Sequence, residues 1–370
     1  MEIFDQRLNR RQTLQVGAGA VLAAYGLSAC GSNDTRGEAK FVKPEIDGDL
    51  LIFNWAEYMD PLLKKSFSEK YGVEVNEVNF DNLEGMVIKL RQGGGPYDLI
   101  FPSGEYVSRL KLEGLLATFD RDSIPNSKGV NPYYDSPWYD EDSNHSMPYT
   151  YYTTGICWRN DLVTDMTGSW NDLTNPAGDG RMFILDDFQE AIGEANLLNG
   201  FELNTEDPDQ IEQSKETLLE QKEFARGFST NTVQNLATGA ALIQQAWNGD
   251  VVNTRNQVSN PEDFSYETCK EGIPVGSDTM AIPNNARSPG TALLFINWIL
   301  DPENAAQNVA WHGYPQPVEG GEQEFQKLVK EEPSIAVSIE ELRDKELEFV
   351  FETPEGRQLW AETFVEVKAA

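Results

Sequence analysis

Histidine and cysteine, which many catalytic and metal sites require, are scarce in this sequence. Its 370 residues include two histidines and three cysteines. A Ser-His-Asp or Cys-His arrangement would have to use His145 or His312, and no cysteines or histidines have the spacing of a zinc site. A phosphate-binding glycine loop and a nucleophile elbow are also missing. The sequence therefore predicts no catalytic residue, no metal site and no cofactor.

Basic residues are few as well. There are 29 Lys and Arg against 61 Asp and Glu, which gives a formal net charge of −32. This charge repels nucleic acid, so we expect no nucleic-acid partner, and it attracts cations. Two interpretations compete: a carboxylate surface adapted to a very salty medium, or a field that gathers a cationic solute. We assign most of the charge to salt adaptation, because concentrated salt shortens the Debye length to about 3 Å and removes long-range steering.

Long apolar runs are missing except near the start of the chain. There, Arg10 and Arg11 precede an uncharged apolar stretch over 16–27, which is too short for a membrane-spanning helix of about 20 residues. It ends in Leu-Ser-Ala before Cys30, which resembles a lipoprotein box. We expect a twin-arginine signal peptide over 1–29 and lipidation of Cys30, which would anchor an exported protein to the membrane. An ordinary cleaved signal with a chance cysteine is the alternative.

The chain after this signal has the features of a large soluble protein. Residues 30–47 are polar and predict a flexible tether, with folded structure beginning near Gly48. The remaining length predicts two domains, at about 100–200 residues each. Cys157 and Cys269 stand alone in ordinary contexts, so a disulfide between them stays open and buried thiols are the default expectation.

Strand and helix patterns alternate over residues 49–116. The run 50–53 is short and continuously apolar, which is typical of a strand buried on both faces in a parallel sheet. An aspartate–proline pair at 60–61 begins a helix, and Gly72 ends it. Two further strand–helix pairs follow, the second with its strand at 98–101 and its helix from about Tyr106 to Leu116. The segment predicts an open βαβαβα sheet.

The rest of the chain predicts a second α/β lobe. Strand patterns occur at 155–158, 182–185 and 241–246. Further helices are expected over 210–226, 290–300, 302–311 and 357–367. The predicted fold class is therefore α/β with two lobes, each an open, mostly parallel sheet flanked by helices.

Aromatic and acidic residues follow two of the predicted strands. Residues 54–58 follow the first strand and residues 102–106 follow the third. Open α/β sheets bind ligands at the carboxyl ends of their strands. A carboxylate binds an organic ammonium group, and an aromatic ring near the cation adds about 0.5–2 kcal/mol. These segments therefore predict a site for a small organic cation.

Eight motifs in sequence order resemble those of the spermidine/putrescine-binding proteins, a family of type II periplasmic receptors. The resemblance runs from Leu50 to Pro317, and its motifs lie at 53–58, 97–103, 146–149, 169–173, 185–190, 246–249, 277–283 and 313–315. It implies a monomeric solute-binding protein that captures a polyamine between two lobes and delivers it to the permease subunits of an ABC importer. No bond would be made or broken.

The resemblance also implies a hinged clamp with defined lobes. Lobe 1 would comprise 48–148 and 277–322, and lobe 2 would comprise 149–276 and 323–370. Strand-like crossovers near Tyr149 to Thr153 and around Val275 would join the lobes, and solute would shift an equilibrium between open and closed forms.

Position by position, the resemblance implies nine residues that contact the solute: Trp55, Glu57, Tyr58, Ser103, Asp187, Glu190, Trp247, Asp278 and Tyr314. The acidic members would bind ammonium groups, and Trp247 would stack on the methylene chain. The structural alternatives are a helix-start Asp187, a core Trp247 and a hinge-supporting Tyr314.

Two positions depart from the family's pattern. Glu105 replaces a tyrosine and Gly276 replaces a tryptophan, so we expect a pocket that has lost one aromatic wall and is wider or more acidic. Another small organic solute is the nearest alternative ligand. An exported hydrolase that uses paired carboxylates is the alternative from a different class.

Overall fold

The computed structural model describes residues 39–93, 95–178, 180–343 and 347–370. The predicted signal peptide, Cys30 and most of the predicted tether lie outside these ranges. Across the described ranges, no helix has both the length and the apolar character needed to span a membrane.

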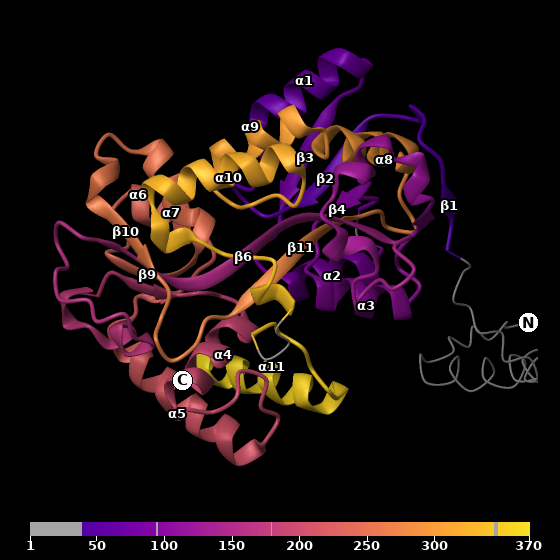
Figure 1. The fold of residues 1–370 in the computed structure, drawn as a ribbon. Helices are drawn as coiled ribbons and strands as arrows, with labels where there is room; N and C mark the ends of the chain where they lie inside the picture. Colours follow the sequence, from indigo (N-terminus) through magenta and orange to yellow (C-terminus); the bar gives the residue numbers. More distant parts are fainter. Residues whose placement is uncertain (1–38, 94, 179, 344–346) are drawn as a thin grey trace, which may run out of the picture. The chain divides into compact units, whose positions relative to one another are not determined.

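A nine-stranded sheet runs through the described part of the chain, as Figure 1 shows. Its strand order is β3 (Val75–Asn79), β2 (Leu50–Asn54), β4 (Leu99–Ile100), β11 (Val275–Ala281), β6 (Ser146–Arg159), β9 (Ile243–Trp247), β7 (Met182–Ile184) and β8 (Gly227–Phe228), with β10 (Phe264–Glu267) paired to β6. Parallel pairing joins β2 to β3 and β4, and β7 to β8 and β9. A separate pair joins β1 (Phe41–Val42) to β5 (Thr118–Phe119).

The long strand β6 connects the two halves of this sheet. Its residues 146–153 pair with β11, and its residues 154–158 pair with β9. Both pairings are antiparallel, unlike those at the ends of the sheet. The crossovers predicted near 149–153 and around Val275 are therefore strands, β6 and the start of β11.

Helices cover both faces of the β2–β4 end of the sheet (Figure 1). Ile52 and Phe53 point to opposite faces and are both fully buried, which accounts for the continuous apolar run. One face packs against α2 (Leu83–Arg91) and α3 (Gly104–Leu112), and the other against α1 (Pro61–Tyr71) and α8 (Pro289–Ile299). Beside them lie α9 (Pro302–His312) and α10 (Glu319–Glu331).

The other end of the sheet carries its own helices. An apolar cluster joins β7 to α4 (Phe188–Leu198), α5 (Pro208–Phe224) and α11 (Pro354–Ala369). Around β9 lie α6 (Thr232–Ala237) and α7 (Asn248–Gln257). The two-lobed α/β fold is thus as predicted. The exact lobe boundaries stay predictions, and the one between residues 322 and 323 falls inside α10.

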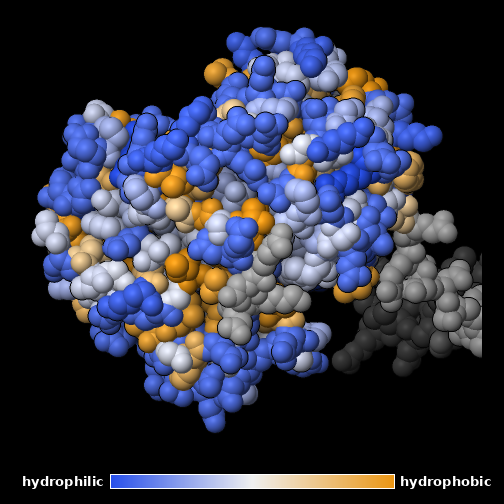
Figure 2. Space-filling model, in the orientation of Figure 1, coloured by the Kyte–Doolittle hydropathy of each residue, from blue (hydrophilic) through white to orange (hydrophobic). Residues whose placement is uncertain are grey.

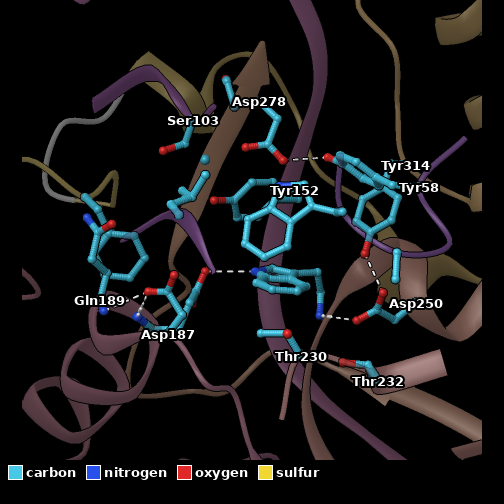
Figure 3. Close-up of a pocket in the computed structure, with 18 of the residues that line it drawn as sticks. Tyr58, Ser103, Tyr152, Asp187, Gln189, Thr230, Thr232, Asp250, Asp278 and Tyr314 are labelled. Atoms are coloured by element: carbon cyan, nitrogen blue, oxygen red, sulfur yellow. Dashed lines mark hydrogen bonds between the residues drawn. The ribbon is translucent and has the colours of Figure 1, made fainter. Parts of the chain in front are cut away.

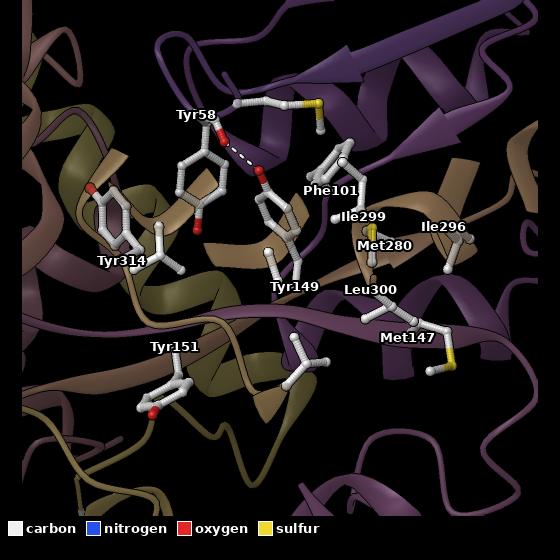
Figure 4. Packing of buried hydrophobic residues seen from close by; sticks show 14 of the residues in the cluster. Tyr58, Phe101, Met147, Tyr149, Tyr151, Met280, Ile296, Ile299, Leu300 and Tyr314 are labelled. Carbon is white, nitrogen blue, oxygen red and sulfur yellow. Dashed lines mark hydrogen bonds between the residues drawn. The ribbon is translucent and has the colours of Figure 1, made fainter. Parts of the chain in front are cut away.

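An aromatic layer lies at the centre of the core, as Figure 4 shows. The Tyr149 ring packs against Phe101 and Tyr58, with ring centroids 4.8 and 5.2 Å apart. The Tyr149 hydroxyl donates to the Tyr58 carbonyl oxygen at 2.5 Å.

Cys157 and Cys269 are both free and buried, which confirms the expectation of buried thiols.

Candidate functional site

A cavity of about 230 Å³ lies between the two ends of the sheet (Figure 3). The loop after β2, the first turns of α3 and α4, the end of β9 and the strand β11 all contribute to its lining. All nine residues predicted from the sequence line this cavity, although they come from segments far apart in the chain.

The lining is strongly acidic. Seven of the lining residues carry carboxyl groups: Glu57, Glu105, Asp187, Glu190, Asp250, Asp278 and Glu348. None of the described residues that line the cavity is a lysine, an arginine or a histidine. Opposite charges attract strongly where water is excluded, so this cavity favours a cationic ligand and disfavours an anion.

Asp278 is buried in β11 beside the aromatic layer. Its Oδ2 accepts a hydrogen bond from the Tyr58 hydroxyl at 2.6 Å, and that hydroxyl also contacts the Thr150 hydroxyl. Burial raises the pKa of Asp278 to about 7, although the bond from Tyr58 acts in the opposite direction. A cation beside this carboxylate would favour its charged form.

Glu190 lies in the first turn of α4 and is also buried. Its Oε1 accepts from the indole N–H of Trp247 at 2.8 Å, which orients the tryptophan ring in the cavity. Its Oε2 is buried and lacks a hydrogen-bond partner among the described residues. Burial, with the neighbouring carboxylate of Asp187, raises the pKa of Glu190 to about 8. A buried carboxylate oxygen without a donor is a natural acceptor for a ligand N–H.

Asp187 has the helix-start role considered for it in the sequence and also lies at the cavity, whereas its contact with a solute stays a prediction. Its Oδ1 caps α4 by accepting from the backbone N–H groups of Gln189 at 2.9 Å and Glu190 at 3.4 Å. The same side chain lines the cavity (Figure 3). Burial raises the pKa of Asp187 to about 6 despite these two bonds.

Asp250 is a lining residue that the sequence analysis missed. Its Oδ1 accepts from the Tyr314 hydroxyl at 2.5 Å, and its Oδ2 accepts from the backbone N–H of Trp247 at 3.1 Å. Burial raises the pKa of Asp250 to about 6. The residue directly follows the motif at 246–249, so its place at the start of α7 was a usable signal.

Glu57 lies at the rim rather than inside the cavity. Its side chain is exposed and its φ is 54°, which is unusual for a residue other than glycine. Its carbonyl accepts from the Asn253 amide at 2.8 Å, and its Oε2 accepts from the Gln257 amide at 3.1 Å. Both partners belong to α7, so Glu57 ties the loop after β2 to the opposite side of the cavity.

Trp55 and Ser103 complete the lining on the side of β2 and β4. The Trp55 ring lies 4.6 Å from Phe80 and 5.9 Å from Trp247, measured between centroids. Ser103 precedes α3 and forms an isolated backbone bridge with Asp278. Its side chain makes no capping hydrogen bond.

The expectation of a lost aromatic wall at Gly276 was wrong. The ring of Tyr152 lies directly over this glycine: a Cβ atom at position 276 would be only 2.5 Å from the Tyr152 Cζ atom. Tyr152 lines the cavity. The aromatic surface is kept, with its side chain supplied by the neighbouring strand.

Glu105 adds a carboxyl group to the lining, in line with the expectation of a more acidic pocket, but this group is paired. Its Oε1 accepts from the Arg357 Nε at 3.0 Å, and Arg357 bonds to Glu84 as well. Glu105 thus adds a carboxylate to the lining together with its own counter-ion. Burial nevertheless raises the pKa of Glu105, and Arg357 limits the rise.

Metal ligation has no support in the described ranges. No three His, Cys, Asp or Glu side chains there are grouped so that they could hold a metal ion.

Two α/β lobes around a cavity lined by aromatic and carboxyl groups define this chain as a two-lobed receptor for a small solute. Residues 63–336 match the family of bacterial extracellular solute-binding proteins, and the chain belongs to that family.

Individual relatives cover most of the chain. The spermidine/putrescine-binding periplasmic protein 1 of Haemophilus influenzae is 28% identical over 95% of this chain and 99% of the relative. The spermidine/putrescine-binding periplasmic protein of Escherichia coli strain K12 is 30% identical over 81% of this chain and 82% of the relative.

Solved structures agree on the fold. The substrate-binding protein of a spermidine/putrescine ABC transporter from Streptococcus pneumoniae superposes with a TM-score of 0.66 at 26% identity, covering 87% of this chain and 99% of that one. A lipoprotein of Treponema pallidum superposes with a TM-score of 0.72 at 22% identity, with the same coverage of 87% and 99%.

Proposed function

We propose that this chain is the polyamine-binding protein of an ABC importer. The observation that carries the proposal is the buried Oε2 of Glu190, which has no hydrogen-bond partner among the described residues, in a cavity whose described lining includes no basic residue. Asp278, Asp187 and Asp250 supply further buried carboxylates, and Trp247 supplies an aromatic surface for the methylene chain. The relatives named for spermidine and putrescine support the same ligand class.

In this proposal the protein acts as a clamp. Solute binds between the lobes and favours their closed arrangement, in which Glu57 contacts α7 and the cavity is shielded from water. The closed form is then presented to the permease. The protein binds and releases its ligand without chemical change. The relatives support this, because both are named as binding proteins.

We further propose that the protein is exported, lipid-anchored through Cys30 and monomeric. Export is supported by relatives that are described as periplasmic. The anchor rests on the sequence of the signal and on Cys30, and the monomeric state rests on the family resemblance.

A thermal-shift screen tests the ligand class. Purified protein is heated with putrescine, spermidine, a neutral sugar, an amino acid and a dicarboxylate, each at equal ionic strength. We expect the two polyamines to raise the melting temperature because they bind the folded state. Stabilisation by the sugar or the dicarboxylate, with none by either polyamine, would contradict the proposal.

A further inference from the structure

Tyr152 and Gly276 are directly paired residues on neighbouring strands. They face each other in the antiparallel pairing of β6 with β11, and both line the cavity. Side chains at paired positions share one face of a sheet and lie about 4.5–5.5 Å apart at their Cβ atoms. The two positions therefore compete for the same space at the wall of the cavity.

A side chain at position 276 and the Tyr152 ring cannot both occupy this space. A Cβ atom on Gly276 would lie 2.5 Å from both the Cζ and the hydroxyl oxygen of Tyr152, and 3.0 Å from Cε2. A Cβ atom does not approach another non-bonded atom to 2.5 Å, so the Tyr152 ring can lie in this position only because Gly276 has no side chain. The pair has room for one aromatic side chain, and the chain carries it on β6.

The Tyr152 ring belongs to a continuous aromatic surface. Its centroid lies 6.1 Å from that of Trp247, which in turn lies 5.9 Å from Trp55. Tyr152 and Trp247 are only partly buried, unlike the residues of the aromatic layer behind them, and both line the cavity. An alkyl chain in the cavity would contact this surface.

The surroundings of the Tyr152 ring are acidic. Burial holds the pKa of the Tyr152 hydroxyl well above its usual value, and the neighbouring carboxylates of Asp278, Glu190, Asp187 and Glu348 add to this rise. Figure 3 places Tyr152 in the middle of the site, with Asp278 on one side and Asp187 on the other. A chain that joins two ammonium groups bound by these carboxylates would pass the ring.

We infer that Tyr152 is a specificity-determining residue: its ring supplies the aromatic wall for the alkyl chain of an organic diamine or triamine, in a position that Gly276 keeps open. This inference rests on the proposed function. It adds that the ring and the glycine act as one coupled pair.

Calorimetric titration of the full-length mature protein with putrescine and with spermidine tests the inference. Tyr152→Phe keeps the ring, so we expect its Kd within about threefold of the wild type. Tyr152→Ala removes the ring and should weaken binding about tenfold, the scale of one aromatic contact to a desolvated cation. Gly276→Ala should weaken binding similarly, because the added Cβ displaces the ring.

A double variant separates the coupled pair from two independent effects. In the Tyr152→Ala background, Gly276→Ala no longer displaces a ring, so we expect little further loss of affinity. Gly276→Trp in that background should restore part of the binding. Melting curves without ligand identify any variant that fails to fold. If Tyr152→Ala does not fold, the affinities of Gly276→Ala and Tyr152→Phe still test the inference.

The failures are distinguishable. If the wild type binds a polyamine and Tyr152→Ala or Gly276→Ala binds it equally well, the inference is overturned and the proposed function stands. The inference is also overturned if the double variant loses as much binding free energy as Tyr152→Ala and Gly276→Ala lose together. If the wild type binds neither amine, the proposed function fails, and this inference fails with it.

Discussion

At the scale of residues, the site is a group of buried carboxyl groups. Their charged form is unfavourable unless a positive group lies beside them. Burial disfavours the charged form of a carboxylate, and a neighbouring carboxylate adds to the effect. Glu190 and Asp278 show this most clearly, with pKa values raised to about 8 and about 7. A bound ammonium group would supply the missing positive charge and lower both values.

Polyamine binding should therefore depend on pH. Before a solute binds, Glu190 holds a proton below about pH 8 and Asp278 holds one below about pH 7. Binding displaces these protons, and the alkylamine itself stays charged below its pKa of about 10. We expect the Kd for putrescine to fall at least tenfold from pH 6 to pH 8, since each displaced proton contributes up to about one decade per pH unit.

Titrations at pH 6, 7 and 8 measure this dependence. Glu190→Gln should reduce the dependence to the part that Asp278 contributes, because the amide at position 190 cannot titrate. Glu57→Gln is the matched control and should keep the wild-type slope, because Glu57 is exposed at the rim. A wild-type Kd that is unchanged from pH 6 to pH 8 would contradict the assignment of these buried carboxylates to the ligand.

Most site residues could be found from the sequence because they lie next to recognisable strand ends. Tyr152 could not be found in this way. Its position over Gly276 depends on the register between β6 and β11, which are separated by more than a hundred residues in the chain. The contact of Glu105 with Arg357 is equally remote, because the partners are 252 positions apart in the chain. No local pattern predicts either contact.

At the scale of elements, α11 is joined to α2 and α3 through Arg357. The helix packs on α4 and α5, whereas Glu84 and Glu105 lie in the first turns of α2 and α3. Arg357 contacts both carboxylates, and its guanidinium group lies over the Tyr106 and Phe188 rings at 5.1 Å. One side chain thus connects two separate apolar clusters beside the cavity.

Loss of this connection should destabilise the protein. The side chains of Arg357 and Glu105 are each 14% exposed. Breaking a fully buried pair costs about 3–5 kcal/mol and an exposed pair about 0–1 kcal/mol. For Arg357→Gln we expect a loss of about 2 kcal/mol in the free energy of unfolding, an intermediate value between these limits.

Chemical denaturation measures that loss. Glu105→Gln added to Arg357→Gln should recover part of it, because no unpaired carboxylate then remains at position 105. Arg91→Gln is the control: Arg91 and Glu113 form a more exposed pair, at 44% and 29%, so a small effect is expected. Equal losses for Arg357→Gln and Arg91→Gln would contradict the role of Arg357.

Elements with local signals were predicted better than those without. The helix α1 begins and ends as expected, because Asp60 caps it, Pro61 occupies its first turn and Gly72 adopts a left-handed conformation with φ 69°. The helix α3 begins at Gly104, two residues before the predicted start. The fourteen-residue strand β6 was predicted only in pieces, because it is buried along most of its length and changes partners midway.

At the scale of the whole molecule, the charge has two parts. The face of the molecule in Figure 2 is mostly hydrophilic, in keeping with 61 acidic residues in the chain. These surface charges are screened in salt. The buried carboxylates of the cavity are screened much less, so the proposed site would keep its preference for cations in a salty medium.

The two halves of the sheet are joined through β6 and β11, which also carry Tyr152, Gly276 and Asp278 of the cavity lining. Movement of one lobe against the other would therefore change the site directly. This arrangement suits the proposed clamp, in which solute binding and closure would be a single equilibrium.

Calorimetric titration of the wild type and Asp278→Asn with putrescine and spermidine tests the central claim most directly. We predict that the wild type binds at least one of the two amines and that Asp278→Asn binds it at least tenfold more weakly, a loss of about 1.4 kcal/mol or more. The claim is contradicted if the wild type binds neither amine, or if Asp278→Asn binds as tightly as the wild type.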